Sequence, residues 1–114
     1  MNHRGFYLFK NDFAVSVKIS LVDGNYISWK EVHSDSSFTS HENVTMEKNS
    51  EKHINLNGST EFVVRLVNKD GTECHEEKVN LLSSSSLASG EVISLQRFVS
   101  SEFQRKVKVD QLVV

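Results

Sequence analysis

The feature that most constrains this chain of 114 residues is a strand–turn–strand pattern in residues 61–82. Phe62, Val64 and Leu66 alternate with less apolar neighbours, which is typical of a strand with one fully apolar face. The turn sequence Asn-Lys-Asp-Gly follows, in which Gly71 can take a positive φ without a Cβ clash. Beyond the turn, alternate residues are expected on one side of the return strand: Glu73, His75, Glu77, Val79 and Leu81. The pattern predicts a hairpin, and therefore a sheet protein.

Residues 13–21 carry the strictest alternation in the sequence. The apolar positions are Phe13, Val15, Val17, Ile19 and Leu21. A helix would scatter these side chains around its circumference, so the segment is expected to be a half-buried strand. The turn-forming sequence Asp-Gly-Asn follows at residues 23–25, and it predicts a hairpin with a return strand over residues 26–32.

Weaker patterns occupy other parts of the chain. Residues 6–9 predict a short first strand, and residues 83–90, rich in serine, predict a flexible connection. Between residues 33 and 59, the apolar pairs Val44/Met46 and Ile54/Leu56 predict two short strands at an edge. The alternative is one long mobile loop, but a structureless loop of that length is unusual in a compact domain.

The carboxyl-terminal part mixes two periodicities. Apolar residues at helical spacing predict a short helix over residues 95–103, with Ser94 as its N-cap and a strand at residues 92–93. Val107 and Val109 alternate with lysines, which predicts a last strand over residues 107–114. The chain is therefore expected to be all-β, an antiparallel β-sandwich of seven or eight short strands with one short helix, forming a single domain over residues 1–114.

Composition excludes some classes of function. Hydrophobic residues make up 38% and charged residues 25%, which is ordinary for a folded soluble chain. Thirteen Lys and Arg against fifteen Asp and Glu give a net charge of -2, so neither nucleic acid nor an anionic membrane is expected as a partner. We expect an intracellular, cytoplasmic location without a membrane span, because Cys74 is the single cysteine and no long apolar run is present.

No arrangement of residues indicates an enzyme. The serine run lacks the G-x-S-x-G context of a nucleophile elbow. Cys74 and His75 are adjacent, so on a strand they point to opposite faces and cannot form a nucleophile–base pair directly. We expect a partly buried thiol beside an exposed histidine.

Metal and cofactor sites are not expected either. The histidines are scattered, without C-x-x-C or H-x-x-x-H spacing: His33, His41, His53 and His75. Asn68, Asp70 and Glu73 could attract calcium, but the twelve-residue ligand loop with its terminal Glu is missing. Turn chemistry explains Asn68 and Asp70 without an ion.

A basic cluster lies near the carboxyl end. It consists of Arg97, Arg105, Lys106 and Lys108. Together with Phe98 and Phe103 it could hold single-stranded nucleic acid. We favour the interpretation in which both aromatics are core residues and the charges form the solvated face, which Glu102 and Asp110 dilute.

Tyr26 and Trp29 are the candidate partner-binding residues. Three residues apart on a strand, they lie on opposite faces, so one is expected in the core and the other exposed. An exposed aromatic side chain on a sheet can anchor a peptide or stack on a sugar. The structural alternative is a core Trp that packs between two sheets.

Three stretches together resemble the meprin-and-TRAF-homology (MATH) family. They are DFAVSVKISLVDGNYIS, TEFVVRLVNKDGTECHEEK and EVISLQRFVSSEFQRKVKVDQLVV, in the family's order. The resemblance implies an eight-stranded antiparallel sandwich that binds short extended peptides or folded domains, as adaptors in ubiquitin ligases or signalling complexes do, with self-association in some members. The Trp of the family's Trp-Gly-Phe element has no counterpart near Ala88, Ser89 and Gly90, so no groove residues carry over.

The leading expectation is therefore a non-catalytic protein–protein interaction module whose partner is a peptide segment, a folded domain or a second copy of the chain. The alternative is a sandwich that binds lipid or carbohydrate, such as a small lectin or membrane-binding module, motivated by Tyr26, Trp29 and the Ser/Asn-rich loops. A third class is an all-β enzyme or inhibitor whose site forms only in three dimensions.

Overall fold

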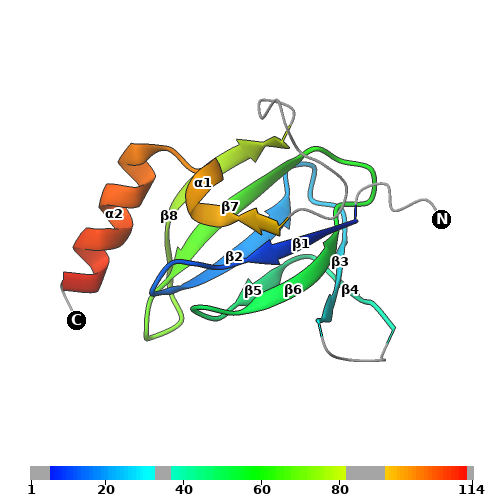
Figure 1. The fold of residues 1–114 in the computed structure, drawn as a ribbon, viewed down its shortest axis with the longest axis horizontal. Helices are drawn as coiled ribbons and strands as arrows, with labels where there is room; N and C mark the ends of the chain where they lie inside the picture. Colours follow the sequence, from blue (N-terminus) through cyan, green and yellow to red (C-terminus); the bar gives the residue numbers. More distant parts are fainter. Residues whose placement is uncertain (1–5, 33–36, 82–91, 113–114) are drawn as a thin grey trace.

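The computed structural model describes residues 6–32, 37–81 and 92–112, which contain nine strands and two helices (Figure 1). In chain order they are β1 (Phe6–Lys10), β2 (Ser16–Leu21), β3 (Ile27–Glu31), β4 (Thr39–His41), β5 (Val44–Met46), β6 (Glu51–Asn55), β7 (Glu61–Val67), β8 (Glu73–Asn80), β9 (Val92–Ser94), α1 (Leu95–Phe98) and α2 (Ser101–Leu112).

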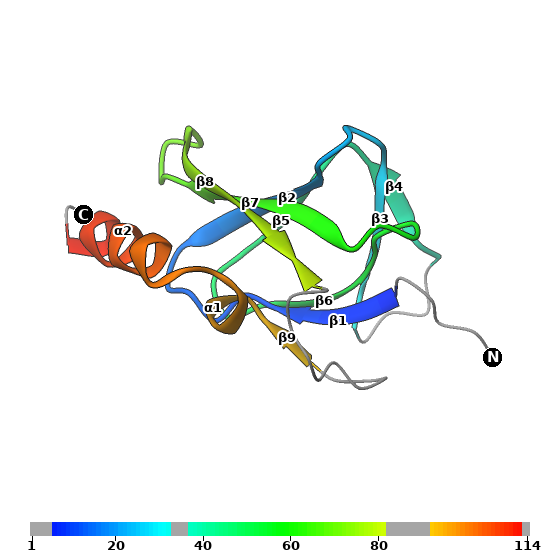
Figure 2. The same ribbon diagram turned by 90° about the horizontal axis from the view of Figure 1, so that it is seen from above.

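The strands form two sheets that face each other as two layers, which Figure 2 shows from above. The five-stranded sheet has the order β4-β3-β6-β1-β9, and the four-stranded sheet has the order β5-β2-β7-β8. The β1–β9 pair is parallel, and the other pairs are antiparallel. The predicted all-β sandwich is confirmed, with nine strands in the described residues rather than seven or eight.

The core lies between the layers because alternate residues of each strand point inward. Fully buried side chains from both sheets meet there: Phe9, Ile27 and Ile54 from one, and Val17, Ile19, Phe62 and Val64 from the other. The rings of Phe9 and Phe62 meet edge to face across the core, with centroids 5.2 Å apart and planes inclined at 65°.

The predicted hairpin of residues 61–82 is confirmed as β7 and β8, with Gly71 at φ 88° in the turn. The prediction that Glu73 lies on the same side of β8 as Val79 is wrong. Arg65 lies opposite Glu76 while Leu66 lies opposite Cys74, so His75 is one residue extra on β8 and takes φ 48°. This β-bulge reverses the alternation and turns Glu73 to the outer face.

The hairpin predicted at residues 23–25 is also wrong, although the turn itself is present. Gly24 has φ 79°, and its N–H donates to the Leu21 carbonyl at 3.2 Å. However, β2 pairs with β5 and β7, whereas β3 pairs with β4 and β6 in the other sheet. The turn chemistry sets the reversal of the chain but not the sheet that the next strand joins.

The middle segment contains the two predicted strands, β5 and β6, and an unpredicted strand, β4. β5 lies at an edge as expected, but the edge position expected for β6 is wrong, because β6 lies between β3 and β1 at the centre of its sheet. The central position agrees with burial, since Ile54 of β6 has no exposed surface.

Asn11 fixes two connections between the sheets and is the one buried polar residue in the described part of the chain. Its Nδ2 donates to the carbonyls of Val15 (2.9 Å), Met46 (3.0 Å) and Glu47 (3.2 Å), and its Oδ1 accepts from the Phe13 N–H at 3.0 Å. One amide thereby joins the β1–β2 connection to the β5–β6 connection, with all its polar atoms satisfied.

The last strand predicted over residues 107–114 is wrong: the chain forms α2 there, while residues 113–114 lie outside the described part. Phe103 and Val107, one helical turn apart, are both buried, and the Phe103 ring lies 6.0 Å from that of Phe13. Ser100 caps the helix, because its Oγ accepts from the Phe103 N–H at 3.1 Å. Ser100 also donates through N and Oγ to the Glu77 carboxylate, both at 2.6 Å.

The single helix predicted over residues 95–103 is divided into α1 and the start of α2, and the strand before it is confirmed as β9. Ser94 holds the position before α1 as predicted but makes no capping bond. Its hydroxyl bonds to Asp12 instead, and the Asp12 carboxylate accepts from the Gln96 N–H at 3.0 Å. The flexible connection predicted at residues 83–90 lies outside the described residues.

Candidate functional site

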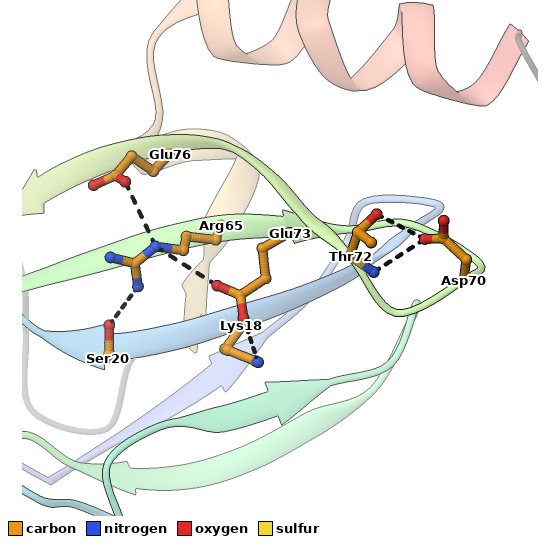
Figure 3. A network of polar contacts seen from close by, with 7 residues as sticks. All are labelled: Lys18, Ser20, Arg65, Asp70, Thr72, Glu73 and Glu76. Atoms are coloured by element: carbon orange, nitrogen blue, oxygen red, sulfur yellow. Dashed lines mark hydrogen bonds and ion pairs between the residues drawn. The ribbon is translucent and has the colours of Figure 1, made fainter.

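The outer face of the four-stranded sheet carries a network of charges, which we call the charged face: Lys18, Ser20, Arg65, Glu73 and Glu76 (Figure 3). Lys18 Nζ lies 2.6 Å from a Glu73 oxygen. Arg65 Nε lies 3.8 Å from Glu73 and 3.6 Å from Glu76, and Arg65 Nη1 donates to the Ser20 hydroxyl at 3.0 Å. The Lys18 hydrogen bond lowers the pKa of Glu73 below its ordinary value of 4.5, aided by the charges of Lys18 and Arg65. The charged side chains of this face therefore pair with one another.

The turn beside this face contains the residues considered for calcium. Asp70 accepts from the hydroxyl of Thr72 at 2.7 Å and from its N–H at 3.0 Å, as Figure 3 shows. These bonds lower the pKa of the Asp70 carboxyl, the side-chain bond most. Asn68 donates to the Thr72 hydroxyl at 3.0 Å, and Glu73 points to Lys18 on the sheet. Asn68 and Asp70 thus serve the turn, as its chemistry predicted.

The edge strand β4 shows a different arrangement. All three of its residues are exposed, and it pairs only with β3 among the described strands. Tyr26, which directly precedes β3, is 57% exposed. Its ring stacks on the imidazole of His41 in β4, with centroids 6.4 Å apart and planes inclined at 12°. The backbone carbonyl of Tyr26 accepts a hydrogen bond from the Asn57 side chain, which fixes the position of Tyr26 just before the start of β3.

Lys30 and Phe38 lie at the other end of β4. The ammonium of Lys30 is 5.6 Å from the centroid of the Phe38 ring, a cation–π contact. Between the two ends, the hydroxyls of Ser28 and Ser40 are hydrogen-bonded at 2.9 Å across the ladder. We call Tyr26, Lys30 and residues 38–42 the β4 edge.

Trp29 occupies a separate environment from Tyr26, as the strand alternation predicted. It lies opposite Ile54 on the core-facing side of β3 and packs against the core while half-buried. Lys52 Nζ lies 4.6 Å from its ring centroid, and the same ammonium pairs with Glu31. One aromatic is therefore mostly structural and the other is exposed, so the structure does not bring the two candidate residues together into one surface.

Cys74 and His75 lie in the β-bulge of β8. The Cys74 thiol donates to Asn68 Oδ1 at 3.5 Å, and the side chain packs against the core, half-buried. His75 is exposed, with the left-handed backbone of the bulge. In the described part of the chain, no three His, Cys, Asp or Glu side chains lie close enough to hold a metal ion. His33 lies outside that part.

The basic cluster near the carboxyl end lies on α1 and α2. Arg97, Arg105, Lys106 and Lys108 are exposed, and Lys106 pairs with Glu102 at 3.7 Å. Phe103 is buried and Phe98 packs against the core, so neither ring is presented for base stacking. No helix in residues 6–32, 37–81 and 92–112 is long and apolar enough to cross a membrane.

Comparison with protein families, with curated proteins and with solved structures finds no match to this chain. The resemblance to the MATH family therefore stays a prediction. The β4 edge was missed from the sequence except for Tyr26, because Thr39, Ser40 and His41 show no apolar alternation. The available signal was the β-favouring pair Phe38-Thr39 within a serine-rich segment.

Proposed function

We propose that this chain is a non-catalytic protein–protein interaction module that binds an extended segment of another protein along the β4 edge. The observation that carries the proposal is the Tyr26 ring, 57% exposed and stacked on His41 of a fully exposed edge strand. An edge strand offers backbone N–H and C=O groups to an added strand, and a rigid exposed tyrosine supplies contact area at a low entropic cost.

The alternative of carbohydrate or lipid binding has less support from the aromatic residues. Stacking on a sugar needs an open ring face, and of the two candidate aromatics only Tyr26 is exposed, because the Trp29 ring packs against the core and lies beneath the Lys52 ammonium. The role of a MATH-like adaptor belongs to the proposal, as does an intracellular location, which the single cysteine Cys74 favours.

The test begins with selection of peptides from a random displayed library against the purified chain. Calorimetric titration of the best binder then compares variants. Tyr26→Ala is expected to raise Kd about 30-fold, since truncation of an interface tyrosine at a hot spot costs about 2 kcal/mol. Thr45→Ala is the matched control, because Thr45 is exposed on β5, an edge strand of the other sheet, and the Kd of this variant should equal that of the wild type.

Equal affinity of Tyr26→Ala and the wild type for the selected peptides would overturn the proposal. The proposal also falls if the library returns no binder while the chain sediments with liposomes or binds a glycan array, which would favour the lipid or carbohydrate alternative.

A further inference from the structure

The β4 edge carries a cation, Lys30, at one end and a carboxylate, Glu42, at the other. Ser28 and Ser40 lie opposite each other in the β3–β4 ladder, and continuing this register places Phe38 opposite Lys30. The alternation of a strand puts Lys30, Phe38 and Ser40 on one side, and extending it by one residue beyond β4 assigns Glu42 to the same side. The contact between Lys30 and the Phe38 ring agrees with this placement.

Neither charge is neutralised within the described chain. The exposed Glu42 and the half-buried Lys30 form no ion pair with any residue that the structure describes, whereas Lys52 on β6 pairs with Glu31. Figures 1 and 2 show no described element beyond β4 on its outer edge. A partner strand would therefore meet Phe38, with the Lys30 ammonium over its ring, at one end and the Glu42 carboxylate at the other, with Ser40 halfway between.

This arrangement is complementary to itself. If two β4 strands pair antiparallel with Ser40 facing Ser40, then Phe38 faces Glu42 of the second copy, and Thr39 faces His41 of the second copy. Lys30, which lies over Phe38, then meets the carboxylate of Glu42 from the second copy. The two-fold axis repeats that contact, so each pairing makes two opposite-charge contacts and joins the two five-stranded sheets edge to edge.

We propose that the partner segment best matched to the β4 edge is β4 of a second copy, so that the chain forms a two-fold symmetric dimer through a continuous sheet. The inference rests on the proposed function, because it uses the same edge. A two-fold contact pairs the β4 edge of one copy with the β4 edge of the other. No free β4 edge then remains, so the assembly ends at two copies, unlike open-ended edge aggregation.

The test is analytical ultracentrifugation of the full chain over a concentration series. The wild type is expected to approach the mass of a dimer reversibly. Lys30→Glu alone and Glu42→Lys alone each create two like-charge contacts per dimer, so the dimer Kd should rise about tenfold or more. An equal mixture of the two variants should dimerise again. In the mixed dimer, the reversed charge at position 30 of one copy meets the reversed charge at position 42 of the other, and the native Glu42 of the first copy meets the native Lys30 of the second.

The matched control is Lys78→Glu, a charge reversal at an exposed position of β8 that should leave the dimer Kd unchanged. Circular dichroism of each variant verifies that it is folded. A wild type that stays monomeric at every concentration, or a mixture that fails to dimerise, would overturn the inference. If a library peptide still binds such a monomer in a Tyr26-dependent manner, the proposed function survives while the inference of a dimer falls.

Discussion

The charged face and the β4 edge use the same kinds of side chain in opposite ways. On the charged face, Lys18 and Arg65 contact carboxylates within their own sheet. At the β4 edge, Lys30 lies over an aromatic ring instead, and Tyr26 exposes more than half of its surface. A surface whose charges are already paired gains little from a partner, because binding would exchange existing contacts for new ones. Under the proposed function, the charged face supports the fold and the β4 edge binds the partner.

The largest expected effect comes from removing the core that supports both surfaces. Phe62 is fully buried on β7 and meets Phe9 of the opposite sheet. Phe62→Ala should lower the free energy of unfolding by about 3–5 kcal/mol, because it removes an aromatic contact and leaves a cavity between the sheets. Urea denaturation measures the change. Phe62→Leu keeps most of the volume and should cost clearly less; equal losses for both variants would show that the core contact is misplaced.

A second prediction separates the two surfaces directly. Arg65→Ala should lower the free energy of unfolding by about 1 kcal/mol, because Ser20, Glu73 and Glu76 lose their shared contact, and should leave peptide affinity unchanged. Tyr26→Ala should do the reverse, with a stability change within about 0.5 kcal/mol and a large loss of affinity. Urea denaturation and calorimetry on the same preparations test both.

The separation fails if Arg65→Ala weakens peptide binding as much as Tyr26→Ala does. It also fails if Tyr26→Ala unfolds the chain, because the ring would then be a structural element of the β3–β4 end rather than an exposed anchor.

The smallest expected effect is the pH dependence of the charged face. Because the pKa of Glu73 is lowered by folding, its contribution to stability is present above the ordinary value of 4.5 and is lost as the pH falls through the lowered value. Lys18→Met removes the main cause of the shift, so its stability should fall less steeply with acid than that of the wild type. NMR titration of the Glu73 carboxyl should give a pKa below 4.5 in the wild type and a higher one in Lys18→Met. A wild-type value at or above 4.5 would contradict the network.

The sequence predicted the parts of the fold that depend on local chemistry. The hairpin of β7 and β8 follows from alternation around a turn that needs a glycine at positive φ, and Gly71 supplies it. The same reasoning failed at residues 23–25, because a turn that also has its glycine at positive φ leads β3 into the opposite sheet. Pairing between strands that are distant in sequence decides that outcome, and no local pattern reports it.

The carboxyl-terminal helix shows a second limit of predicting the fold from the sequence. Val107 and Val109 alternate over too few residues to separate a strand from a helix, while the spacing of Phe103 and Val107 fits one helical turn. Burial of those two residues and the Ser100 cap decide for α2. At the candidate site, alternation predicted the separation of Tyr26 from Trp29 but not the β4 edge, since an exposed three-residue strand has no hydrophobic pattern to reveal it.

Amide hydrogen exchange, measured at a concentration at which the chain is monomeric and with or without a saturating library-selected peptide, tests most directly whether partners bind at the β4 edge. Binding there predicts slower exchange at residues 39–41 in the complex, with unchanged rates along β5 and β8, the edge strands of the other sheet. Slower exchange along β8, or no change at residues 39–41, would contradict it.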